Sequence, residues 1–190
     1  MPDKDSLAER GRSLEDDYFR KRDLELIERM RRAAAAEQGR VELGQRVGLT
    51  DPELLRQLEA LGFTPDTVVL LPLVPAVQMA WAEGGVSAAE RELLVQLARR
   101  RGIEPGSAAD RTLAQWLAAR PGADVFAGAT RLIRAMLAAP GGHDLTAAEL
   151  VAHSESIAQA SGGRLGRNRI SAEERQLLTA LADELQTRSG

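Results

Sequence analysis

The sequence has no cysteine, six aromatic residues and only two histidines among 190 residues. Without cysteine the chain can form no disulfide, no thiolate metal site and no cysteine nucleophile, which fits a cytoplasmic protein. His153 lies four residues after Glu149 on an expected helix, but no third ligand accompanies them at a spacing that suits zinc. The G-x-S-x-G nucleophile elbow is also missing. These absences predict a protein that is not an enzyme.

Neither the charge nor the hydropathy of the chain indicates nucleic acid or a membrane. The 25 basic and 28 acidic residues give a net charge of -3, so the chain as a whole has no general attraction for nucleic acid. The apolar stretch 67–81 contains no charge, but it is shorter than the roughly 20 residues of a membrane span and contains Pro72 and Pro75. The first residues lack the apolar run of a secretory signal peptide. We therefore expect stretch 67–81 to be the buried central helix of a soluble bundle, kinked at its prolines.

Helix-capping motifs recur along the chain and no segment shows the alternation of a β-strand. Each motif places a serine or threonine before a helix and an acidic residue three positions later, as in Thr50, Ser87, Ser107, Thr146 and Ser171. Alanine, leucine and arginine, which favour helix, dominate the composition. The sequence predicts an all-α fold of about eight helices, with antiparallel neighbours joined mostly by short turns.

The first 40 residues differ from the rest because half of them are charged, ten basic and ten acidic. We expect a long helix over about 6–36, then a break near 39–49 where glycines occur. This divides the chain into a charged helical arm, 1–46, and a helical domain, 47–190. The sparse apolar residues of the arm, among them Tyr18, Phe19 and Ile27, are candidates for binding a protein partner. Alternatively the arm lies on the domain, or it pairs with a second copy as a coiled coil to form a homo-oligomer.

Residues 86–98 and 170–182 form an internal repeat with an offset of 84 residues. Eight of the thirteen positions are identical, and each copy begins with a capping box and continues with a leucine face. Two helix–loop–helix units of this kind are expected to pack about a pseudo-twofold axis. Leu94 and Leu178 would then be equivalent buried positions, although two good helix starts could also resemble each other without duplication.

The segment 79–90, Met-Ala-Trp-Ala-Glu-Gly-Gly-Val-Ser-Ala-Ala-Glu, resembles the repeated A-D-G-x-[IV]-[ST]-x-x-E signature of TerB-like tellurite-resistance domains. The resemblance covers roughly 65–187 and leaves the charged arm outside. It implies an all-helical, pseudo-symmetric domain with a role in stress response. By position, the acidic residue of the family's loop falls on Glu83 and that of its helix start on Glu90. The second copy has Glu174 but no aspartate in its loop, so this part of the signature is missing.

The resemblance implies that the loop acids bind a divalent cation, with Glu83 and Glu90 as the candidate ligands, whereas the residues by themselves predict no cofactor. The structural alternative is that Glu90 and Glu174 cap their own helices. A basic cluster in the second loop, Arg164, Arg167 and Arg169, is a candidate anion site, with a solvated loop as its alternative.

The sequence therefore predicts a non-catalytic interaction or stress-response protein that binds a protein partner. The alternative function is binding of a divalent metal or a small anion at the two loop–helix junctions.

Overall fold

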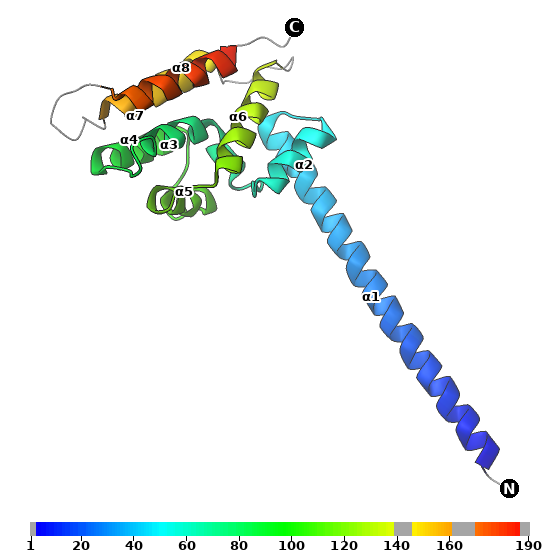
Figure 1. The fold of residues 1–190 in the computed structure, drawn as a ribbon. Coiled ribbons are helices and arrows are strands. Elements are labelled where there is room, and N and C mark those ends of the chain that lie inside the picture. The colour runs from blue at the N-terminus through cyan, green and yellow to red at the C-terminus, as the bar shows by residue number, and fades with distance from the viewer. Residues whose placement is uncertain (1–2, 139–145, 161–169, 187–190) are drawn as a thin grey trace. The chain divides into compact units, whose positions relative to one another are not determined.

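The computed structural model describes the backbone of residues 3–138, 146–160 and 170–186, and the side chains of these ranges from Tyr18 to Leu185 (Figure 1). Within these ranges the chain is all-α and contains no strand, which confirms the predicted fold class. The chain divides into two compact units, residues 1–41 and 42–190. The division lies inside the first helix, somewhat before the boundary at residue 46 that the sequence suggests.

The described elements are eight α-helices and one 3₁₀ helix. In chain order they are α1 (Asp3–Val47), α2 (Pro52–Ala60), η1 (Val68–Leu73), α3 (Val74–Ala80), α4 (Ala88–Arg100), α5 (Ala108–Ala118), α6 (Ala123–Ala138), α7 (Ala147–Ala160) and α8 (Ala172–Gln186). None of these helices combines the length and the apolar composition that crossing a membrane requires.

α1 continues through Gly39 and Gly44, so the predicted helix end near residue 36 is wrong, and the break falls only at the end of the expected range 39–49. Gly44 is buried in the helix, and a Cβ atom added there would lie 2.7 Å from the backbone oxygen of Leu49. Its own carbonyl accepts a hydrogen bond from the Leu49 amide at 3.0 Å. The glycine therefore serves a close approach between two backbones rather than a helix end. The helix ends at Val47, and Gly48 follows with a positive φ of 64°.

The start of α2 differs from the expected cap by one residue. Asp51, not Thr50, is the N-cap, and its carboxylate accepts from the Glu53 amide at 2.8 Å. Pro52 then occupies the first turn, where its missing N–H group costs nothing. Aspartate and threonine are both good caps, so the sequence alone did not separate them.

The apolar stretch 67–81 is a 3₁₀ helix that passes directly into an α-helix, rather than one kinked α-helix. Pro72 lies inside η1, and Pro75 lies in the first turn of α3. A proline at position 75 cannot donate to the carbonyl four residues earlier, and its ring crowds that carbonyl. The α-helical pattern therefore begins anew at Val74. The stretch is buried along most of its length, as its lack of charge predicts.

The two copies of the repeat both form reciprocal capping boxes. In the first, the Ser87 amide donates to the Glu90 carboxylate at 2.7 Å, and the Glu90 amide donates to Ser87 Oγ at 3.3 Å. In the second, the corresponding distances between Ser171 and Glu174 are 2.7 and 3.1 Å. The predicted starts of α4 and α8 are thus confirmed.

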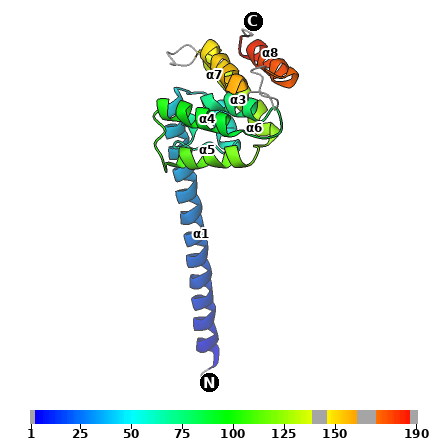
Figure 2. The same cartoon turned by 90° about the vertical axis from the view of Figure 1, so that its left-hand side faces the viewer.

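In unit 42–190 the helices that carry the two copies, α4 and α8, both pack on α3 and α7. α3 packs along α7, α4 also packs on α7, and α8 packs on α7, α6 and α3 (Figure 2). The equivalence of the two leucines is only partial: Leu94 is fully buried, whereas Leu178 is partly buried against the core. α4 packs on η1, α3 and α7, whereas α8 packs on α7, α6 and α3, so the two leucines face different neighbours.

The two tryptophans are partly buried, and a hydrogen bond connects them. Trp81 Nε1 donates to the backbone oxygen of Trp116 at 2.8 Å. The ring of Trp116 meets Phe63 edge-on, with 6.0 Å between ring centroids. The Trp81 N–H group thus has a hydrogen-bond partner, and both indoles pack against the aliphatic core.

Candidate functional site

The candidate metal ligands Glu83 and Glu90 lie in different surroundings. Glu83 is exposed in the loop after α3. Glu90 is only 3% exposed and its carboxylate is occupied by the amide of Ser87. Among the described residues no group of three or more acidic, histidine or cysteine side chains is placed to hold a metal ion. The geometry of Glu90 is that of a helix cap.

The two capping carboxylates lie within electrostatic reach of each other. Glu174 is 1% exposed, so both carboxyl groups are buried. Burial raises the pKa of Glu90 above its ordinary value, and repulsion from Glu174 and Glu83 adds to the rise, while hydrogen bonds from Ser87 oppose it. The Glu90 carboxyl group is therefore harder to ionise than that of an ordinary glutamate.

The candidate anion ligands Arg164, Arg167 and Arg169 lie outside the described residues.

A second polar cluster, between the end of α4 and the start of α7, was not predicted from the sequence. Arg101 Nε and His153 Nδ1 are both buried without a hydrogen-bond partner within the described part of the chain. Burial and the neighbouring Arg101 cation lower the pKa of His153, against the opposing charge of Glu149. Burial likewise lowers the pKa of Arg101. Helical spacing alone relates Glu149 to His153, and only the packing of α4 on α7 brings the arginine to them.

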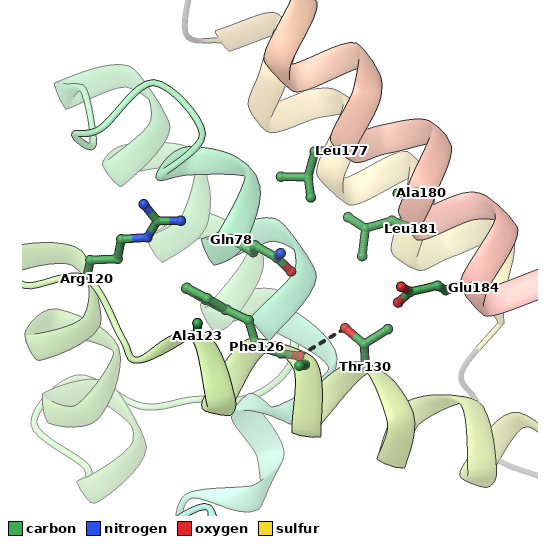
Figure 3. A pocket seen from close by; sticks show the side chains of 10 residues that line it. Gln78, Arg120, Ala123, Phe126, Thr130, Leu177, Ala180, Leu181 and Glu184 are labelled. Carbon is green, nitrogen blue, oxygen red and sulfur yellow. Dashed lines mark hydrogen bonds between the residues drawn. The ribbon is translucent and has the colours of Figure 1, made fainter.

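A pocket of about 200 Å³ lies between α3, α6 and α8, with Arg120 from the segment before α6 at its edge (Figure 3). Its apolar wall includes Phe126 and Leu181, which are buried. Its polar lining includes Gln78, the one polar side chain of α3. Gln78 is the residue by which the pocket could have been found from the sequence, because it is a polar amide within an otherwise apolar stretch.

The candidate partner-binding residues Tyr18, Phe19 and Ile27 are all exposed on α1. The rings of Tyr18 and Phe19 meet edge-on, with 5.9 Å between centroids. Arg22 Nε donates to the Tyr18 hydroxyl oxygen at 3.1 Å. The Tyr18 hydroxyl group therefore already has a hydrogen-bond partner on its own helix. Phe19 is the more available of the two rings for contact with a partner.

Two further residues, Leu26 and Met30, share one side of α1 with Phe19. The three positions are spaced by seven and four residues, which brings them to the same side of an α-helix. The exposed fractions are 61% for Phe19, 52% for Leu26 and 64% for Met30. We call these three residues the α1 apolar face. Sequence analysis named Phe19 as a candidate but missed Leu26, because apolar residues elsewhere on the helix obscured the stripe.

In comparisons with known proteins, no family model, no curated protein and no solved structure matches this chain.

Proposed function

We propose that this protein is a non-catalytic interaction protein that binds a protein partner through the α1 apolar face. The observation that carries the proposal is the exposure of Phe19, Leu26 and Met30, each more than half open to solvent on one side of one helix. Large apolar side chains in such a row are the anchors by which amphipathic helices bind grooves on other proteins. Unit 42–190, by contrast, buries most of its large apolar residues in its own core.

The charge around the face indicates the character of the partner. Residues 18–41 contain seven basic and four acidic side chains, although the whole chain is net acidic. Two of the acidic residues are engaged by arginines of the same helix, Glu28 with Arg32 at 3.0 Å and Glu37 with Arg40 at 2.8 Å. A groove with an apolar floor and an acidic rim is complementary to this helix. The stress-response role that the TerB-like resemblance implies stays a prediction about the process in which such a partner acts.

A photocrosslinking amino acid placed on α1 tests the proposal in the intact chain. Placed at Leu26, it samples the apolar face; placed at Ala35, nine residues or two and a half turns further on, it samples the opposite side. Both positions are exposed, so the pair is matched. We expect a protein adduct from position 26 that position 35 does not give.

The captured protein is then purified and its affinity measured against two variants. Leu26→Asp should weaken binding by about tenfold or more, since a buried anchor is lost, whereas Ala35→Asp should change it by less than about twofold. Added salt should weaken binding to a partner with an acidic rim.

Three results would overturn the proposal. Identical adducts from positions 26 and 35 would mean that the face has no selectivity. An adduct only with a second copy of the chain would make the face a homo-oligomer contact. Binding to phosphatidylcholine–phosphatidylserine vesicles that Leu26→Asp abolishes would make it a membrane-surface helix.

A further inference from the structure

Three polar side chains around the α3–α6–α8 pocket have no partner within the described part of the chain. Gln78, Arg120 and Glu184 take part in no side-chain hydrogen bond or ion pair there, although all three line the same pocket. Thr130 differs, because its hydroxyl donates to the backbone oxygen of Phe126 at 3.1 Å. The pocket therefore offers one cation, one anion and one amide, all unused.

The two charges lie at opposite ends of the pocket (Figure 3). Arg120 lies beyond Ala123 at the start of α6, and Glu184 lies beside Thr130 on the facing helix. Ala123 and Thr130 are seven residues apart, which is about 10 Å along an α-helix. Gln78 lies between the two ends in this view. A ligand that contacts both side chains needs a carboxylate at one end and an ammonium group at the other. In a free α-amino acid these two groups are attached to the same carbon, so it reaches only one end.

We infer that this pocket binds a dipeptide of small residues, with its carboxylate at Arg120, its ammonium group at Glu184 and its peptide group at Gln78. A guanidinium group binds a carboxylate through two parallel hydrogen bonds, and a glutamate is the natural partner of an ammonium group. The glutamine amide both donates and accepts, so it matches the N–H and C=O groups of a peptide bond. The other lining residues are apolar, except for Thr130, whose hydroxyl group is bonded to the backbone of Phe126.

The size and wall of the pocket limit the side chains of the ligand. With a volume of about 200 Å³, the pocket suits alanine or glycine residues rather than large ones. Phe126 and Leu181 supply an apolar surface for methyl groups. Exposed residues at the edge, including Ala127 and Ala180, leave the pocket open for entry.

Calorimetry and NMR with L-alanyl-L-alanine test the inference on the full chain. We expect saturable binding and a shift of the Gln78 side-chain amide resonances. N-acetylation of the dipeptide removes its ammonium charge, and amidation of its C-terminus removes its carboxylate. Each should weaken binding by about tenfold, the loss of one charge-assisted contact of about 1.4 kcal/mol. Free alanine, which reaches only one end, should bind at least as weakly.

Variants of the protein identify which end holds which charge. Arg120→Gln should weaken binding of the parent dipeptide about tenfold but leave the amidated form unaffected, and Glu184→Gln should do the same for the acetylated form. Arg131→Gln, an exposed position on α6 outside the pocket, is the matched control and should change nothing. Leu26→Asp on α1 should also leave dipeptide binding intact, so this result is separate from the partner-binding proposal.

The inference is overturned if the dipeptide causes no amide shift at millimolar concentration. It is equally overturned if the blocked peptides bind as well as the parent, or if the two pocket variants bind like Arg131→Gln.

Discussion

Glu90 keeps its carboxyl group away from water and near the second buried acid, Glu174, so ionisation of Glu90 works against the fold. A carboxyl group whose pKa is higher in the folded than in the unfolded chain stabilises most when it is protonated. Its contribution is fully present below the unfolded value of 4.5 and is lost as the pH rises through the raised folded pKa.

We therefore predict that the stability difference between wild type and Glu90→Gln depends on pH. Glutamine keeps an acceptor for the Ser87 amide but carries no charge. The wild type should lose stability relative to Glu90→Gln as the pH rises from about 4 to 7, measured by urea denaturation at several pH values. Glu104→Gln, at an exposed position, should show no such trend. A stability difference that stays constant with pH would mean that folding does not raise the pKa of Glu90.

Much of the residue-level detail could be predicted because caps are local. Ser87 and Glu90 lie three residues apart, so their reciprocal bonds require only that a helix begins there. The nearness of Glu90 to Glu174, and of Arg101 to His153, depends on how α4 and α8 pack on α7, and no short segment of sequence contains that information. The pocket shows the same limit: Gln78 is conspicuous in its own stretch, but Arg120 and Glu184 are ordinary surface charges until α6 and α8 are placed.

At the scale of the element, the two glycines of α1 have different roles that the sequence does not distinguish. Helix propensity treats both as weak points, which is why we expected a break over 39–49. In the structure Gly39 has no atom within 4 Å of an added Cβ, whereas at Gly44 the added atom meets Leu49 and Leu55.

We predict opposite effects for alanine at these two positions. Gly44→Ala should destabilise unit 42–190 by about 1–3 kcal/mol, because the backbone of Leu49 has to move away. Gly39→Ala should leave that stability unchanged and raise the helix content of α1, since alanine is favoured by about 1 kcal/mol in an open helix position. Urea denaturation and far-ultraviolet circular dichroism measure the two quantities. Equal effects would show that Gly44 has room for a side chain.

The element types were predicted better than the joints between them. Apolar spacing and capping residues indicated the helices of unit 42–190, and the prolines of stretch 67–81 indicated an irregularity. Whether that irregularity is a kink or a change from 3₁₀ to α-helix depends on which neighbours accept the carbonyls that the prolines leave free. That is a property of packing, and it remained open in the sequence.

At the scale of the whole molecule, the last turns of α1 belong to the core of unit 42–190. Leu43 and Val47 are buried there, and Gly44 packs on Leu49. A boundary drawn at residue 46 would separate Leu43 and Gly44 from the side chains that they contact.

We predict that the fragment 42–190 folds with the stability of the full chain, whereas the fragment 48–190 is weakened by several kcal/mol. Burying a leucine or valine contributes about 1.5–3 kcal/mol, and the shorter fragment lacks both Leu43 and Val47. Thermal and urea denaturation of the two fragments measure the difference. If both fragments are equally stable, the end of α1 is not part of the core; if both are unfolded, residues 1–41 are needed for folding.

The hydrogen bond from Trp81 to the backbone of Trp116 has a spectroscopic consequence. These are the only two tryptophans of the chain, both lie in unit 42–190, and the single tyrosine, Tyr18, lies in unit 1–41. Indole emission therefore reports on one unit and phenol emission on the other, without any label. Unfolding of the helical unit should shift the tryptophan spectrum as the Trp81 bond opens to water. A partner that covers Phe19 should instead change the emission of the neighbouring Tyr18 and leave the tryptophan emission unchanged.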